Sequence, residues 1–139
     1  MSASFEEKSV WIQVVSLVVA LGGYLVAAFW MAREGVTELA AYMPLFVAAV
    51  VVQVILLIVG HTVAAIAQKP EHADERDRLI AWRAEARSSW LLAVGVLAAV
   101  SMLAMGIAAL WVAHVLIVAL FVSTLLGYVL QMIDYRRGF

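Results

Sequence analysis

The sequence predicts an all-α integral membrane protein, built as an antiparallel bundle of four transmembrane helices. Two observations predict this fold class. First, 66% of the residues are hydrophobic and only 14% are charged, whereas about 25% are charged in an ordinary soluble domain. Second, the charged residues gather in short clusters that are separated by long uncharged stretches. Because a helix needs about 20 apolar residues to cross a bilayer, each stretch has room for one span or two.

The first two spans are predicted at residues 9–32 and 43–67. The stretch from Ser9 to Ala32 contains no charged residue, and neither does the stretch from Leu39 to Gln68. We expect the second helix to begin near Pro44, because proline is accepted in the first turn of a helix.

The last two spans, predicted at residues 88–107 and 111–133, share one uncharged stretch from Ser88 to Ile133. A single helix over this stretch would be about 69 Å long, more than twice the hydrocarbon thickness of about 30 Å. The chain must therefore turn within it. The segment from Gly106 to Trp111 is the best candidate, because it combines a helix breaker with an aromatic residue typical of membrane interfaces.

Basic residues predict the orientation of the chain. Short cytoplasmic loops carry an excess of Lys and Arg, and here Arg33 stands alone on one side of the predicted spans. All other basic residues lie on the opposite side: Lys8, Lys69, Arg76, Arg78, Arg83, Arg87, Arg136 and Arg137. This distribution places the N-terminus, the C-terminus and the loop between the second and third spans in the cytoplasm.

A charged helix is predicted at residues 71–87. It follows Pro70, has its acidic residues first and ends with Arg83 and Arg87, an order that suits the helix dipole. No helix breaker intervenes before Trp90, so we expect this helix to run into span three as a stalk. Helical spacing places one set of residues on a single face, the best candidate for touching a partner: His72, Glu75, Leu79, Trp82 and Ala86.

The segment Asp74-Glu75-Arg76-Asp77, followed by Ile80 and Arg83-Ala84, resembles the D-E-R-[DE]-x-x-I-x-x-[KR]-[AS] signature of small uncharacterised bacterial four-span membrane proteins. The resemblance is complete over residues 74–84 and covers little else. In those families the motif precedes a membrane span, and the genes often neighbour small helix-turn-helix regulators. The resemblance therefore implies the bacterial cytoplasmic (inner) membrane and a role in signalling or sequestration, with no established activity.

Two interpretations of the motif stay open. Asp74, Glu75, Arg76, Asp77, Ile80 and Arg83 could bind a cytoplasmic or membrane-protein partner. Alternatively, the motif is a salt-bridged helix that fixes where span three enters the membrane, with Arg83 and Arg87 reaching anionic headgroups.

Small residues predict the surfaces on which the helices pack, because membrane helices associate through close approach and interhelical hydrogen bonds. Ala119, Ser123 and Gly127 recur at intervals of four residues along span four. A second stripe lies along span one: Ser16, Ala20, Gly23 and Ala27. Packing within one bundle and packing in a homodimer are both compatible with these stripes.

Few strongly polar side chains fall within the predicted spans: Gln13, Gln53, His61 and His114. Each is costly to expose to hydrocarbon, so each should face protein or water. His61 and His114 are expected in opposite leaflets and cannot share a metal ion or haem. His61 could relay protons, although a hydrogen-bonded structural role is the simpler explanation for both histidines.

No cofactor or metal is expected. The chain has no cysteine, which removes thiolate chemistry and zinc ribbons. His72 with Glu71, Asp74 or Glu75 has metal-ligating types at helical spacing, but acidic first turns are common for dipole reasons.

The sequence therefore predicts a small interaction or regulatory protein, not an enzyme, that acts through its charged helix and does not bind nucleic acid directly. Its expected partners are the lipid bilayer and a cytoplasmic or membrane protein. The alternative is a small oligomeric transporter or channel in which His61 is the only serviceable ionisable group within the spans.

Overall fold

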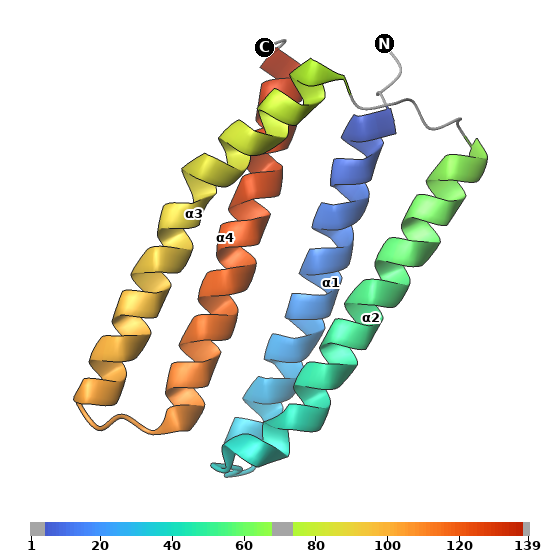
Figure 1. Cartoon of the computed structure of the whole chain (residues 1–139). Helices are drawn as coiled ribbons and strands as arrows, with labels where there is room; N and C mark the ends of the chain where they lie inside the picture. Colours follow the sequence, from blue (N-terminus) through green and yellow to red (C-terminus); the bar gives the residue numbers. More distant parts are fainter. Residues whose placement is uncertain (1–4, 68–73, 138–139) are drawn as a thin grey trace.

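The computed structural model describes residues 5–67 and 74–137, which form four α-helices. These are α1 (Phe5–Arg33), α2 (Leu39–Ala67), α3 (Glu75–Ala104) and α4 (Ala109–Arg137), and each runs antiparallel to the next (Figure 1). All four are long and apolar enough to cross a membrane. The predicted all-α class with four long apolar helices is confirmed.

Glycine ends the first helix of each hairpin. Gly35 and Gly106 have φ angles of 80° and 74°, which residues with a Cβ rarely adopt. At Gly106 the amide donates to the carbonyl of Leu103, and the following Ile107 amide donates to Met102. The same pair of hydrogen bonds surrounds Gly35. Both ends are Schellman caps, which satisfy carbonyls that the helix leaves free.

Two predicted boundaries are wrong. α2 begins at Leu39 and contains Pro44 in its interior, because neighbouring helices and local adjustment let apolar helices tolerate a proline. The turn between α3 and α4 covers residues 105–108, so Trp111 lies within α4. The turn therefore depends on Gly106 rather than on the aromatic residue.

The charged segment and span three form one continuous helix, α3, which begins at Glu75 rather than at residue 71. Residues 68–73 lie outside the described part of the chain. Asp74 is the N-cap: its side chain accepts a hydrogen bond from the Asp77 amide at 2.8 Å, and the Asp77 side chain accepts one from the Asp74 amide at 3.1 Å. In this reciprocal capping box the Asp74 side chain is used to cap its own helix.

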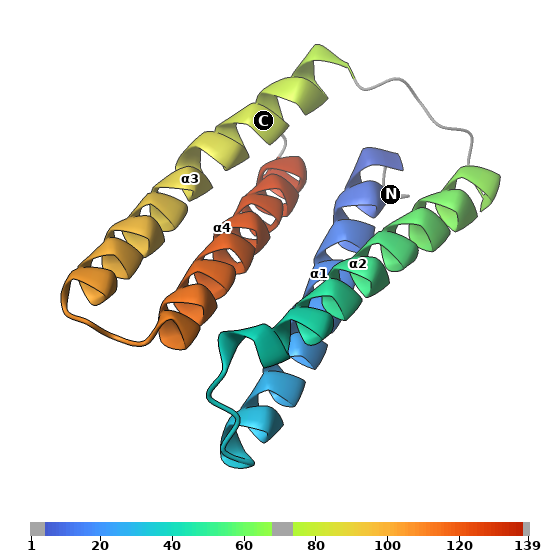
Figure 2. The same ribbon diagram turned by 60° about the horizontal axis from the view of Figure 1, so that its bottom comes forward.

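The helices form an incomplete ring. α3 packs along α4, α4 packs on α1, and α1 packs on α2, whereas α2 and α3 make no comparably extensive contact within the described residues. Figure 2 shows α3 and α2 on the outer sides of the molecule, with α4 and α1 between them. The molecule is therefore two helical hairpins that are joined along the contact between α1 and α4.

A small hydrophobic core lies near the hairpin turns, where α1, α2 and α4 meet. It consists of Tyr24, Ala28, Tyr42 and Leu110. The hydroxyl of Tyr42 donates to the Val36 carbonyl at 2.9 Å, which satisfies its polar end inside the protein. Tyr42 is therefore a packing residue of the core, whereas Trp30, Trp90 and Trp111 are more than half exposed.

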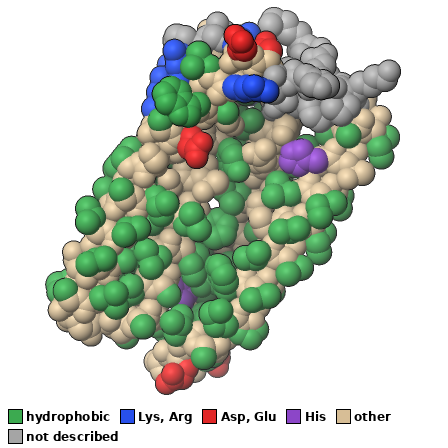
Figure 3. Space-filling view, in the orientation of Figure 1, with side chains coloured by type: hydrophobic (Ala, Val, Ile, Leu, Met, Phe, Trp, Pro, Cys, Tyr) green, Lys and Arg blue, Asp and Glu red, His purple; other side chains and the backbone are tan. Residues whose placement is uncertain are grey.

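Charge divides the molecule into two ends. The start of α1, the start of α3 and the end of α4 lie together at one end, where the described basic residues other than Arg33 also gather (Figures 1 and 3). We call this the basic end. The opposite end carries the two hairpin turns with Glu34 and Glu38.

Candidate functional site: a polar cleft and the exposed face of α3

The predicted stripe on span four lies against α3. The Ser123 hydroxyl donates to the Ser88 carbonyl at 2.9 Å. A Cβ added at Gly127 would meet the Ser88 hydroxyl at 3.1 Å, and one added at Gly95 would overlap the Cβ of Ala119. These small residues let the two helices approach closely, so the stripe serves contact within one chain.

The predicted stripe on span one is only partly in contact. Ser16 and Ala20 are buried and Ala27 is half-buried, but Gly23 is exposed and has no neighbour within 4 Å of an added Cβ. The predicted stripe differs from the buried side of α1 because that side continues from Ala20 through Tyr24 and Ala28. Gly23 is therefore not a packing residue in this chain.

His61 is fixed by hydrogen bonds to both of its ring nitrogens. Nδ1 lies 2.9 Å from the Leu57 carbonyl, which can only accept, so Nδ1 carries the proton. Nε2 then accepts from the Ser9 hydroxyl at 2.9 Å, and the Gln13 amide donates to that hydroxyl at 3.5 Å. The sequence analysis singled out His61 and Gln13 but missed Ser9, which joins them across α1 and α2.

Gln53 of α2 extends this chain of hydrogen bonds toward the middle of the helices, through Ser16 of α1. Its amide nitrogen donates to the Ser16 hydroxyl at 3.2 Å, and that hydroxyl donates to the Gln13 carbonyl at 3.0 Å. The Gln53 side-chain oxygen is buried and has no hydrogen-bond partner within residues 5–67 and 74–137. Three of the four predicted polar residues, Gln13, Gln53 and His61, therefore lie along the contact between α1 and α2.

His114 has the same arrangement at the other end of α1. Its Nδ1 lies 2.8 Å from the Leu110 carbonyl, and its Nε2 lies 3.3 Å from the Tyr24 hydroxyl. Ser9 and Tyr24 are about 22 Å apart along α1, so the two histidines cannot share a ligand, as the sequence predicts.

A polar cleft begins at the basic end and runs along the α3–α4 contact. Its main part is a cavity of about 400 Å³ lined by residues of α3 and α4. A smaller cavity of about 170 Å³ shares Ala81 and Gln131 with it and reaches Ser9 and Gln13 of α1. The smaller cavity therefore adjoins the main one and is lined by Ser9 and Gln13 of the hydrogen-bonded chain of His61.

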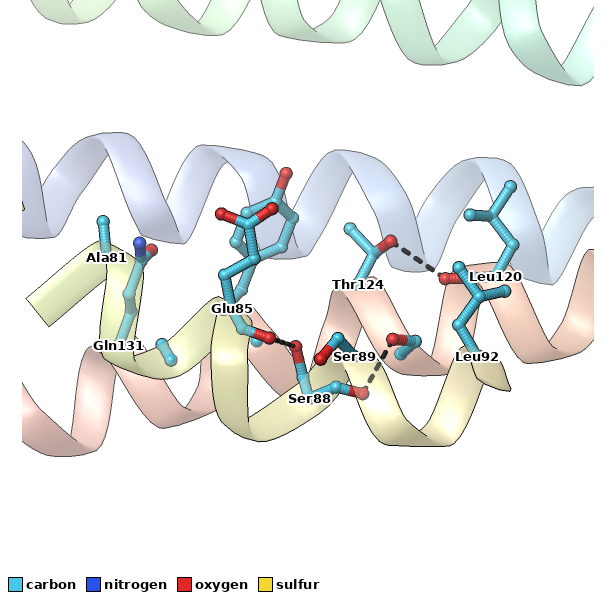
Figure 4. Close-up of a pocket in the computed structure, with 12 residues that line it drawn as sticks. Ala81, Glu85, Ser88, Ser89, Leu92, Leu120, Thr124 and Gln131 are labelled. Carbon is cyan, nitrogen blue, oxygen red and sulfur yellow. Dashed lines mark hydrogen bonds between the residues drawn. The ribbon is translucent and has the colours of Figure 1, made fainter. Parts of the chain in front are cut away.

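Hydroxyls, an amide and one carboxylate supply the chemistry of the main cavity. Its polar lining consists of Glu85, Ser88, Ser89, Ser123, Thr124, Tyr128 and Gln131. In Figure 4 the Glu85 carboxylate points away from the ribbon that carries it, whereas the Thr124 hydroxyl donates to the Leu120 carbonyl of its own helix at 2.9 Å. Glu85 forms no ion pair within the part of the chain that the structure describes. The cleft could thus bind a polar or cationic group.

A second carboxylate that the sequence analysis missed is buried at the basic end. Asp134 has a side chain only 8% exposed and lies 3.4 Å from the guanidinium of Arg87, whose side chain is 55% exposed. Asp134 follows the uncharged stretch directly, and this position in the sequence gives no sign of its burial. The ion pair joins α3 to α4 on the basic-end side of the close contacts that Ser88 makes.

The structure divides the six predicted partner-binding residues into three groups. Asp74 and Asp77 cap α3. Ile80 is buried, with 2% of its surface exposed, and faces the bundle together with Ala84. Glu75, Arg76 and Arg83 are exposed. Half of the motif therefore builds and anchors the helix, and half is presented to the surroundings.

Leu79 and Trp82 lie exposed beside Glu75. They are 44% and 66% exposed, and their spacing with Glu75 places them on one side of the helix, away from the buried Ile80 and Ala84. We call Glu75, Leu79 and Trp82 the exposed face of α3. His72, the other predicted member at the start of the helix, lies outside the described residues.

No metal-binding group of three or more His, Cys, Asp or Glu side chains occurs among the described residues. The predicted set around His72 and Glu71 falls in the segment that is not described.

Comparison of the chain with protein-family models, with curated proteins and with solved structures gives no match.

Proposed function

We propose that the protein is a small interaction or regulatory protein of the bacterial inner membrane, and that its exposed face of α3 binds a protein partner. In this proposal all four helices cross the bilayer and the basic end lies in the cytoplasm. The distribution of Lys and Arg supports this orientation.

The observation that carries the proposal is the exposure of Leu79 and Trp82 on α3. The N-terminus of this helix is already capped, and its inner side is already packed against the bundle. The cap of α3 is formed by its own side chains, and its inner side is buried through Ile80 and Ala84. Neither apolar side chain belongs to the buried core of the described residues. Tryptophan is among the residues that dominate binding energy at protein interfaces, and its charged neighbours suit a polar rim.

Site-specific photocrosslinking tests the proposal, with a benzophenone amino acid placed at position 82 or 90 in native membranes. Trp90 is the matched control, because it is 58% exposed on the same helix but lies within the predicted span. We expect position 82 to crosslink to one protein, and Leu79→Ala in the same chain to weaken this adduct. Position 90 should give lipid adducts. Lipid adducts alone at both positions would refute the proposal.

A second candidate function, a small carrier or channel, is favoured by the polar cleft. Thr124 lies about 20 Å along α4 from its end at Arg137, so the cleft extends well into the apolar part of the helix pair. Glu85 and His61 are ionisable groups near this path.

Proton flux into vesicles tests this candidate. Purified protein is reconstituted into liposomes that contain a pH-sensitive dye, and an imposed pH gradient is followed. A proton flux that falls in both the Glu85→Gln and the His61→Gln variant, but not in the Trp82→Ala control, would establish the carrier function. Flux equal to that of protein-free vesicles would remove it.

A further inference from the structure

An apolar groove runs along the α3–α4 pair on the side opposite to the polar cleft. The groove has a volume of about 610 Å³ and is lined by Leu91 and Val94 of α3 and by Val118 and Val122 of α4. The cleft is lined instead by Leu92, Leu120 and Thr124. Residues two positions apart lie about 200° apart around a helix, so the groove and the cleft open in opposite directions.

Two arginines continue the line of the groove toward the basic end. Arg87 stands four residues before Leu91, and Arg83 stands four residues before Arg87, so all three share one side of α3. Both arginines are exposed. Asp134 holds the Arg87 guanidinium across the α3–α4 contact at 3.4 Å, which fixes its position while leaving other N–H groups free to donate.

We infer that the groove and the two arginines form a binding site for one anionic phospholipid of the cytoplasmic leaflet. The phosphate lies between Arg83 and Arg87, and an acyl chain fills the groove. The inference rests on the membrane insertion and the orientation in the proposed function, but not on a protein partner.

The dimensions and chemistry of the site match such a lipid. On α3 the lining of the groove extends about 16 Å from Leu91 to Met102, and Ile107 and Trp111 continue it at the hairpin turn. This length accommodates an acyl chain of one leaflet, which spans about half of the hydrocarbon thickness of about 30 Å. Guanidinium groups bind phosphate through paired N–H donors. The site has cationic side chains at one end and an apolar lining along the remainder, which is the pattern that an anionic lipid requires. Basic pockets between membrane helices are known to bind anionic headgroups.

Native mass spectrometry of the purified protein tests the inference. The protein in detergent is mixed with equal amounts of phosphatidylglycerol and phosphatidylcholine that carry identical acyl chains, and the retained lipid is identified by mass. We expect one phosphatidylglycerol molecule to be retained in preference. Each arginine near an anionic group contributes about fivefold in affinity, so Arg83→Gln should lower the preference about fivefold.

Arg87 is replaced together with its partner, as Arg87→Gln with Asp134→Asn, so that no carboxylate is left buried and unpaired. This double variant should also lose about fivefold. Arg78→Gln is the matched control, because Arg78 lies on the same helix at the same end but lines the polar cleft. It should leave the preference unchanged.

A groove variant separates headgroup recognition from acyl-chain binding. Val94→Trp fills the groove and should abolish retention of both lipids, whereas Val100→Trp places the same side chain at an exposed position outside it. Equal retention of the two lipids by the native protein, or an unchanged preference in both arginine variants, would overturn the inference. Crosslinking at position 82 is independent of these substitutions, so failure here leaves the proposed function standing.

Discussion

Gly95 of α3 and Ala119 of α4 face each other so closely that no Cβ fits at Gly95 without displacing Ala119. The close approach brings Ser123 within hydrogen-bonding distance of the Ser88 carbonyl, one step further along the same contact. In a membrane, where burial of apolar surface between helices gains little, such close packing and its hydrogen bonds are the main source of stability.

Substitution of this glycine should loosen the α3–α4 hairpin. We expect Gly95→Ala to destabilise the protein by about 1–3 kcal/mol through overpacking. Gly22→Ala is the matched control: an added Cβ there has no neighbour within 4 Å, and alanine should stabilise α1 by roughly 0.5–1 kcal/mol. Thermal unfolding in detergent measures both. A Gly95→Ala variant as stable as Gly22→Ala would show that the two helices lie further apart.

The capping box predicts a specific effect of Asp74. Asp74→Ala should cost about 0.5–2 kcal/mol and should speed hydrogen exchange of the first amides of α3, whereas Asp74→Asn retains the acceptor and the cap. Glu75→Ala is the neighbouring control, because Glu75 is exposed and does not cap the helix. If Asp74→Asn behaved like Asp74→Ala, the carboxylate charge, and not the hydrogen bond, would be the important property.

The hydrogen bond between Ser9 and His61 should couple α1 to α2. A double-mutant cycle of Ser9→Ala and His61→Ala is expected to give a coupling energy of about 0.6 kcal/mol, the average for polar contacts between membrane helices. Thr62 supplies the reference cycle with Ser9, since its hydroxyl bonds to the Ile58 carbonyl of its own helix at 2.7 Å. A coupling energy no larger than that of Ser9 with Thr62 would contradict the contact.

The orientation can be tested with single cysteines, because the chain contains none of its own. We expect Leu79→Cys to react with a membrane-impermeant maleimide only after the cytoplasmic side is made accessible, and Glu38→Cys to react in intact spheroplasts. Both positions are exposed, so accessibility to the reagent is not limited by the fold. The reverse labelling pattern would invert the proposed topology.

The sequence predicts the four helices well because long apolar segments of adequate length leave the backbone no other way to satisfy its hydrogen bonds in lipid. It also predicts the contacting stripe of α4, since Ala119, Ser123 and Gly127 recur with the period of one helix face. Gly106 is correctly predicted at the turn between α3 and α4. These features depend only on local periodicity and composition.

The sequence does not predict features that depend on the rotation of each helix about its axis and on its position along the neighbouring helices. The partnership of Ser9 with His61 requires knowledge of both, and Ser9 has no distinguishing feature in the sequence. Gly23 looked equivalent to Ala20, yet only one of them meets a neighbour. Glu85 and Asp134 lie just outside the uncharged stretch, and their sequence positions do not reveal that the folded chain directs one into the cleft and buries the other.

The arrangement of contacts also determines which motion is easiest for this protein. Each hairpin is held by its own extensive pairing, whereas the main contact between the two hairpins is that of α1 with α4, with Tyr42 of α2 against His114 of α4 beside it. A rotation about that line would change the separation of α2 from α3 without disrupting Gly95 against Ala119 or Ser9 against His61. Whatever enters or leaves between those two helices can thus be accommodated by pivoting two rigid halves.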